Sequence, residues 1–296
     1  MNRILCYLKI DVLVWVALIQ VSIAFGFLRP LGIDVALNQF GITLVLLSSI
    51  CIAAAGQLIM ALYSNRIQPK TTKKEENSIF NTFLITTIVG IAIGFYLSNI
   101  IQRPIFITIF IIISALFYLY ATYLKEILIV KNVLIAFSIG MVILNMGIFD
   151  LLPAITAQNR SALQTVFSIL LDYGLLLFVL TLIYELVNDA RFLESDQKSG
   201  VITLPVKIGP KMSLKITAVL FLIPIAMISY YMYTYFFSKS IIIGFILLFM
   251  VAPLLTAAIL LLDKTDQKSI KKSLFLLKLV FVSIALSFVL YPYTIL

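Results

Sequence analysis

Long apolar segments follow one another along the whole chain, and they constrain its fold more than any other feature of the sequence. Nine such segments alternate with polar connections, near residues 10–28, 39–63, 78–100, 104–123, 132–152, 163–188, 213–236, 239–262 and 272–293. Each approaches the roughly 20 residues that a helix needs to cross about 30 Å of hydrocarbon. Hydrophobic residues make up 62% of the 296 positions and charged residues only 12%, which is too few for the surface of a water-soluble protein. We therefore predict an all-α integral membrane protein, a single bundle of nine transmembrane helices that forms one domain over residues 1–296.

The basic residues are distributed unevenly between the two sides of such a bundle. The side opposite the N-terminus would carry only four of the 22 Lys and Arg residues, namely Arg29, Arg103, Arg160 and Lys239. The positive-inside rule then places the N-terminus and the more basic connections in the cytoplasm. Because this topology accounts for the net charge of +9, we do not predict binding to nucleic acid.

Histidine is absent from the sequence, and the two cysteines, Cys6 and Cys51, lie far apart. Their spacing does not indicate a disulfide framework. The missing histidine also removes the commonest nitrogen ligand of zinc, iron and copper. Any metal ion would therefore be bound mainly by oxygen, which favours magnesium, calcium or manganese.

An acidic cluster lies in the segment ELVNDARFLESDQKSGVITLPVKIG, residues 185–209, within an otherwise apolar chain. Its carboxylates are Glu185, Asp189, Glu194 and Asp196. The first two are four residues apart, so a helix would place them on one face. Such a cluster fits either a divalent metal site or a solvated helix end, and the spacing does not separate these interpretations. The lysines that follow, and that could contact phosphate oxygens, are Lys198, Lys207 and Lys211.

The same segment resembles the second aspartate-rich motif of the UbiA superfamily of intramembrane prenyltransferases, D-x-x-D-x-x-x-D followed by G-x-x-TLPV-x-x-G. Asp189 and Asp196 match the outer acids, and Phe192 stands in place of the middle one. The tail of the motif is matched by Gly200, Thr203, Leu204, Pro205, Val206 and Gly209.

A second stretch, YATYLKEILIVKN at residues 120–132, is similar to the family's Y-S-x-x-L-K sequence followed by G-N. It supplies Tyr120, Lys125 and Asn132, while Lys131 stands in place of the glycine. Together the two stretches identify the chain as similar to this family over essentially its whole length.

The resemblance implies transfer of a polyprenyl chain from its diphosphate to an acceptor within the bilayer, with Mg²⁺ binding the diphosphate. It implies that Asp189 and Asp196 are catalytic metal ligands, and that Lys125 is catalytic through contact with phosphate. From the residues themselves we add Glu194 to the predicted metal ligands. The predicted substrate-binding residues are Tyr120, Asn132, Lys198, Lys207 and Arg66. The expected partners are a polyprenyl diphosphate, an unidentified small acceptor and the lipid bilayer.

One part of the family pattern is missing. The first acidic motif should follow the run AAAG at 53–56, but no Asp or Glu occurs between Asp34 and Glu75. Three hypotheses remain open. The first is a divergent prenyltransferase that binds diphosphate with the second motif and basic residues such as Arg66, Lys70 and Lys125. The second is a catalytically inactive relative that binds or scaffolds isoprenoid lipids. The third is a multi-pass transporter that uses Asp172, Glu185 and Asp189 as polar sites within the membrane.

Overall fold

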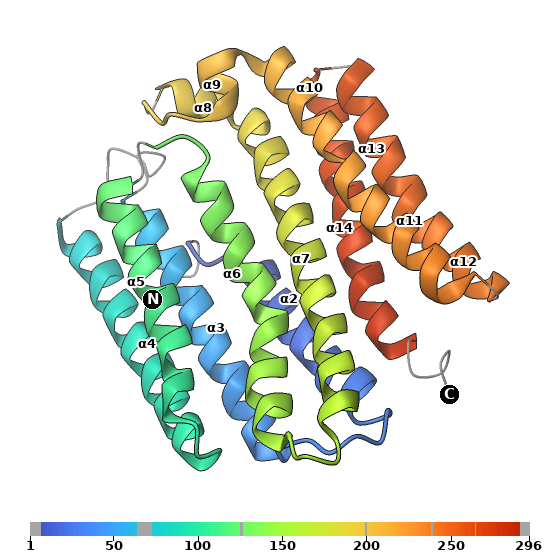
Figure 1. The fold of residues 1–296 in the computed structure, drawn as a ribbon. Coiled ribbons are helices and arrows are strands. Elements are labelled where there is room, and N and C mark those ends of the chain that lie inside the picture. Colours follow the sequence, from blue (N-terminus) through green and yellow to red (C-terminus); the bar gives the residue numbers. More distant parts are fainter. Residues whose placement is uncertain are drawn as a thin grey trace. The chain divides into compact units, whose positions relative to one another are not determined.

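The structure is a computed structural model that describes residues 7–63, 73–124, 127–198, 200–237, 239–263 and 265–290. These ranges are helical and contain no strand (Figure 1). The α-helices are α2 (Ile10–Val21), α3 (Gln39–Leu62), α4 (Lys73–Ile100), α5 (Ile107–Leu119), α6 (Val130–Met146), α7 (Arg160–Arg191), α8 (Leu193–Lys198), α9 (Leu204–Ile208), α10 (Pro210–Leu220), α11 (Leu222–Phe236), α12 (Ser240–Ile246), α13 (Ala252–Asp263) and α14 (Gln267–Leu290). Shorter 3₁₀ and π-helical segments continue them at η1 (Ser22–Leu28), η2 (Pro104–Phe106), η3 (Tyr120–Leu124), η4 (Gly147–Leu151), η5 (Leu152–Ala154) and η6 (Leu247–Val251).

Joined end to end, these elements form nine helices within the described ranges that are long and apolar enough to cross a membrane. The predicted all-α class and the nine predicted spans are therefore confirmed. Two helices extend beyond their apolar segments: α4 begins at Lys73 rather than near residue 78, and α14 begins at Gln267 rather than near residue 272. A helix can continue in water after its apolar part ends, so hydropathy underestimates its length. The sidedness of the membrane stays a prediction.

The chain divides into two compact units. Unit 1 contains Met1–Lys125, Ser138–Gly174 and Phe288–Leu296, and unit 2 contains Glu126–Phe137 and Leu175–Ser287. Three of the four boundaries fall within α6, α7 and α14, so each of these helices contributes residues to both units. A single domain over residues 1–296 stays a prediction.

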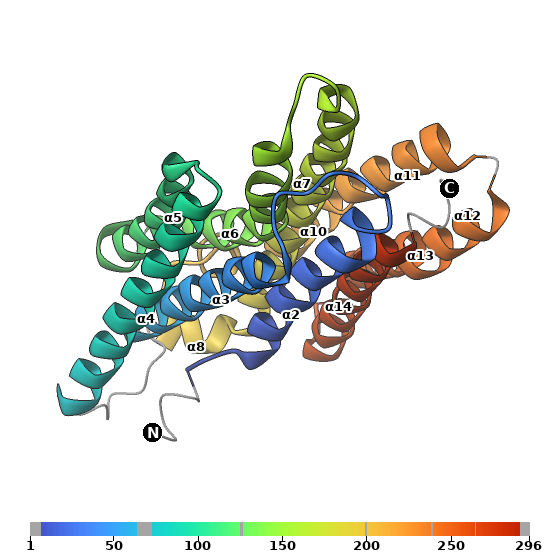
Figure 2. The same cartoon turned by 90° about the horizontal axis from the view of Figure 1, so that it is seen from below.

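Unit 1 is built around α3, which packs between α2 and α4 (Figures 1 and 2). Glycines allow α4 to approach its neighbours closely. A Cβ atom on Gly90 would lie 2.8 Å from the Ile52 side chain, and one on Gly94 would lie 2.4 Å from the Phe110 ring. The Ser48 hydroxyl also donates a 2.7 Å hydrogen bond to the carbonyl of Gly90. This geometry agrees with the GxxxG pattern that small residues form at membrane helix interfaces.

A buried carboxylate fastens the connection between η1 and α3 in unit 1. Asp150, in η4, is 1% exposed and accepts a 2.7 Å hydrogen bond from the backbone N–H of Leu37. Its own carbonyl accepts a 2.9 Å bond from the N–H of Ala36. Asn38 then caps α3, since its side-chain oxygen accepts from the N–H of Gly41 at 2.9 Å. The loop backbone is thus satisfied where α3 begins.

In unit 2, α10 packs against α13, and a turn segment that includes α8 and α9 follows the end of α7. Gly200 and Gly209 have φ values of +66° and +83°, in the region that residues with a Cβ atom rarely adopt. Close packing does not require glycine at these two positions, because a Cβ atom at either would contact nothing within 4 Å among the described residues. The two glycines of the G-x-x-TLPV-x-x-G stretch therefore serve the backbone turns on either side of α9.

Candidate functional site

The candidate site is a corner of unit 2 where the first turn of α6 meets the last turns of α7, which we call the α6–α7 corner and define by Lys131, Asn132 and Asp189. The Lys131 Nζ atom lies 2.5 Å from Oδ1 of Asp189 and forms an ion pair with it. The Asn132 side-chain amide donates a 2.9 Å hydrogen bond to Oδ2 of the same carboxylate. Both carboxylate oxygens of Asp189 are therefore engaged by side chains of α6.

Burial makes this contact energetically important. The Asp189 side chain is 2% exposed and the Lys131 side chain 20% exposed, while Asn132 is also buried. A carboxylate removed from water needs an opposite charge and hydrogen-bond donors, and the corner supplies both. The end of α7 provides the enclosed position, since every residue from Glu185 to Ala190 is buried. Glu185 lies one turn before Asp189 and shares this buried segment.

The first turn of α6 is positioned against local preference. The carbonyl of Ile129 accepts the N–H of Val133 at 3.0 Å, so Ile129 precedes the helix as its cap, although its side chain can accept no hydrogen bond. Its φ is +69°, which is a genuine outlier for a β-branched residue. Lys131 then places a cation at the positive end of a helix dipole, which is also unfavourable. The contacts of Lys131 and Asn132 with Asp189 offset these local costs.

The structure brings together only some of the predicted site residues. Asp189 and Asn132 meet directly at the corner. Asp196, in α8, is fully buried, whereas the side chains predicted to contact metal or phosphate from the same segment are exposed, namely Glu194, Lys198 and Lys207. Tyr120 is buried in η3, which belongs to unit 1. Lys125 and Arg66 lie outside the described residues.

The Lys131 ammonium and the Asn132 amide occupy both oxygens of Asp189, and this arrangement does not fit a metal ion at the same carboxylate. Among the described residues no group of three or more His, Cys, Asp and Glu side chains is placed to hold a metal ion. Asp189, Glu194 and Asp196 do not form such a three-acid group within these residues. Phe192, where the family motif has its middle acid, is 38% exposed, and the Arg191 guanidinium lies 5.2 Å from the centre of its ring. The ligand roles of the three acids stay a prediction.

Lys131 belongs to the site, although the sequence motifs did not indicate a role for it. The sequence shows only that a lysine stands in place of the motif's glycine, next to Asn132. A usable signal was present, because a buried aspartate favours a cationic partner, and a chain without histidine can supply one only as Lys, Arg or a metal ion. Choosing Lys131 among the basic residues requires knowledge that the start of α6 lies beside the end of α7.

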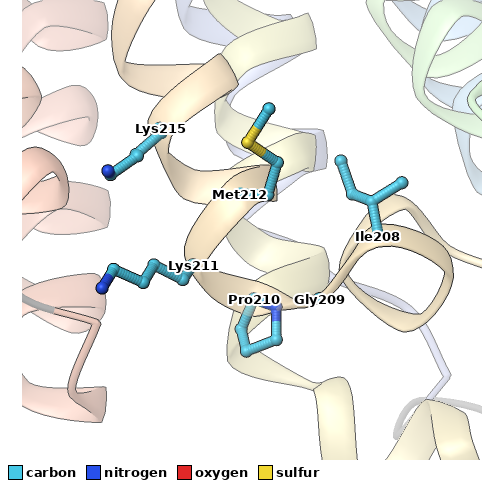
Figure 3. A pocket seen from close by; sticks show the side chains of 6 residues that line it. All are labelled: Ile208, Gly209, Pro210, Lys211, Met212 and Lys215. Atoms are coloured by element: carbon cyan, nitrogen blue, oxygen red, sulfur yellow. The ribbon is translucent and has the colours of Figure 1, made fainter.

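A pocket of about 290 Å³ lies elsewhere in unit 2, along the start of α10 (Figure 3). It is lined by Ile208, Gly209, Pro210, Lys211, Met212 and Lys215. Figure 3 shows Lys211 and Lys215 on one side of the helix and Ile208 on the other. No residue of the α6–α7 corner lines this pocket, so we do not assign the site to it.

Comparisons with known proteins place the fold. The sequence matches the UbiA prenyltransferase family over residues 75–282, which is more than half of the chain. A digeranylgeranylglyceryl phosphate synthase structure is 19% identical with a TM-score of 0.62, and the match covers 98% of this chain and 99% of that chain. The apo structure of a UbiA homolog from Aeropyrum pernix K1 is 11% identical with a TM-score of 0.67, covering 95% and 99%.

A third similar structure, of a UbiA homolog from Archaeoglobus fulgidus bound to GPP and Mg²⁺, is 14% identical with a TM-score of 0.56 and covers 94% of this chain and 97% of that chain. The comparison with curated protein sequences found no match. At these identities the structural likeness shows the fold, and the family match shows the membership. This chain, with its buried Asp189 and its TLPV turn, belongs to the UbiA prenyltransferase family.

Proposed function

We propose that this protein is a membrane-embedded prenyltransferase that moves a polyprenyl chain from its diphosphate to a small acceptor. The observation that carries the proposal is the α6–α7 corner, where a family-motif aspartate is buried and holds a lysine and an asparagine. Structures of a UbiA homolog from Archaeoglobus fulgidus, which has the same fold, are bound to GPP and Mg²⁺ or to DMAPP and Mg²⁺.

Lys131 is the residue of the corner best suited to contact the diphosphate. An ammonium group carries three hydrogens, and Asp189 is its ion-pair partner among the described residues. One fifth of the side chain is exposed, so the group can also meet a phosphate oxygen. Asp189 acts as a positioning residue, because it orients the lysine without touching the substrate.

In the transfer itself, the allylic C–O bond breaks and its electron pair leaves with the diphosphate. The acceptor then forms a bond to the allylic carbon and releases a proton. Positive side chains stabilise the charge that develops on the leaving diphosphate. Lys131 would stabilise this charge at the α6–α7 corner, and the exposed Lys198 and Lys207 of the motif segment at residues 185–209 would add to it. The apolar helices hold the prenyl chain and exclude the water that would quench the cation. Because the residues at Asp189 do not fit a metal ion, no step is assigned to one.

Release of diphosphate tests the proposal most directly. The purified full chain in lipid nanodiscs would be given radiolabelled GPP or longer prenyl diphosphates with a panel of aromatic, quinone-precursor and glycerol-phosphate acceptors. We expect acceptor-dependent release, reduced at least about 100-fold by Asp189→Asn, because the variant no longer orients the Lys131 ammonium toward the leaving diphosphate, and loss of one aligned donor at a reacting group typically costs this much. Lys215 is an exposed lysine on α10, so Lys215→Met is the matched control and should retain activity. No release with any donor and acceptor would refute the proposal.

An isoprenoid-binding protein without catalysis is the second candidate, and a specific observation favours it. The sequence has no acidic residue between Asp34 and Glu75, where the family's first motif should lie. A carrier needs the apolar interior but not the chemistry of ionisation. Binding of GPP that persists in Asp189→Asn, without turnover in the unaltered protein, would support this candidate.

The transporter hypothesis has less support. Asp172 lies on α7 thirteen residues before Glu185, which corresponds to about 20 Å along the helix. The three predicted polar sites therefore do not form one cluster. Flux of ions or substrate in proteoliposomes would support the transporter hypothesis.

A further inference from the structure

We propose that the Lys131 ammonium takes the place of a divalent metal ion on Asp189, so that prenyl diphosphate binding at the α6–α7 corner needs no metal there. The choice of a prenyl diphosphate as the ligand rests on the proposed function, whereas the contacts of Lys131 and Asn132 with Asp189 do not depend on it. It assigns Lys131 as a built-in cation that both anchors the corner and presents positive charge to the ligand.

The geometry of Asp189 is the first support. Its Oδ1 atom is 2.5 Å from the Lys131 Nζ atom, and its Oδ2 atom is 2.9 Å from the amide of Asn132. Magnesium binds carboxylate oxygen at about 2.0–2.1 Å and demands near-octahedral geometry, so it would require space that the ammonium occupies. Two cations on one carboxylate oxygen would also repel each other strongly. Metal binding at Asp189 would thus require Lys131 to leave.

The position of Lys131 is the second support. It lies in the first turn of α6, where the helix dipole disfavours a cation, and it follows Ile129, whose φ of +69° is strained. Neither feature stabilises an isolated helix. Their presence is explained when the ammonium is required at this point of the fold to neutralise a buried carboxylate.

Two departures from the family pattern agree with each other. The chain has lysine where the second stretch should have glycine, and it lacks the acids that the first motif should provide. A metal ion shared between two acidic motifs needs ligands from both. Loss of one set of ligands weakens the binding of that ion, and a lysine beside Asp189 supplies a positive charge in its place.

The exchange also changes the charge of the site. An ammonium group contributes one positive charge where a divalent ion contributes two, so a bound diphosphate must be neutralised by further side chains. The exposed Lys198 and Lys207 belong to the same unit as the corner. Because exposed charges are screened by salt, we expect GPP affinity to fall as ionic strength rises.

Binding of Mn²⁺ alone, followed by electron paramagnetic resonance, tests the inference without any substrate. In the otherwise unaltered protein, Asp189→Asn should leave Mn²⁺ uptake unchanged. Lys131→Gly, which restores the residue of the family pattern, should gain one Mn²⁺ site at least 10-fold tighter than any in the parent, and adding Asp189→Asn should abolish it. Lys131→Gln serves the same purpose if the glycine variant does not fold. Stoichiometric Mn²⁺ binding by the parent that Asp189→Asn removes would overturn the inference.

Binding of GPP with and without EDTA provides the second arm. The unaltered protein should bind GPP within twofold in both conditions, whereas Lys131→Gly should lose at least 10-fold in EDTA and recover with Mg²⁺. Loss of binding in EDTA by the unaltered protein would overturn the inference. If the unaltered protein binds no prenyl diphosphate in either condition, the proposed function fails, and the Mn²⁺ measurement alone decides the role of Lys131.

Discussion

Replacing Lys131 by methionine removes the ammonium from Asp189 while keeping a side chain of similar length. Asp189 is 2% exposed, so its carboxylate would remain buried without this partner. Removing one partner of a buried ion pair costs about 3–5 kcal/mol, because an uncompensated charge is left behind. Since the Lys131 side chain is 20% exposed and partly solvated, we expect the lower end of this range, about 3 kcal/mol.

The reciprocal change should cost less. In Asp189→Asn the ammonium loses its partner but can still reach water, and we expect a loss of about 1 kcal/mol. The double variant Lys131→Met with Asp189→Asn removes both charges and retains an amide beside Asn132. Replacing a whole buried pair by neutral groups is often close to neutral, so the double variant should lose only about 1–2 kcal/mol. The coupling energy between the two positions is then about 2–3 kcal/mol.

Equilibrium unfolding in mixed micelles with increasing dodecyl sulfate, followed by far-ultraviolet circular dichroism, measures these differences. Lys215→Met is the matched control, because this exposed lysine should change stability by less than about 0.5 kcal/mol. The reasoning is refuted if Lys131→Met costs no more than the control, or if the double variant is as unstable as the sum of the two single variants.

Three further predictions concern other parts of the chain. Gly94→Ala should destabilise unit 1 by about 1–3 kcal/mol, because the new methyl group would overlap the Phe110 ring, and micelle unfolding will measure the loss. Asp150→Ala should leave the N–H of Leu37 without its acceptor and cost about 1–3 kcal/mol, whereas Asp150→Asn, which keeps an acceptor, should cost less in the same assay. The hydrogen bond from Ser269 lowers the pKa of the Asp266 carboxyl. The stabilisation of the start of α14 is therefore complete above the ordinary pKa of an aspartate and is lost as the pH falls through the lowered value. Carbon-13 NMR titration of the carboxyl, together with amide exchange at α14, will check this.

Most of the fold could be predicted from the sequence, because membrane spans are determined by local composition. A run of about 20 apolar residues must form a helix in hydrocarbon, whatever its neighbours are. Gly90 and Gly94 likewise indicate a packing face through their spacing alone. The helix ends were less predictable, since α4 and α14 begin in polar residues that hydropathy assigns to loops.

The site was predicted less completely. The motif at residues 185–209 led to Asp189, and the stretch at 120–132 led to Asn132, but their contact is between residues 57 positions apart. The sequence also suggested Glu194 as a metal ligand beside Asp189; the Glu194 side chain is exposed, and its role stays a prediction. Spacing within one segment does not determine which side chains of that segment point inward.

The sequence by itself determined the class of this protein, its long apolar helices and its family, because each depends on residues close together along the chain. Only the tertiary structure decided that the cation on Asp189 is Lys131, a residue that the motif expects to be glycine. The physical reason is that a buried charge selects its partner by distance in space, and the sequence offers 22 basic residues without stating which one lies near.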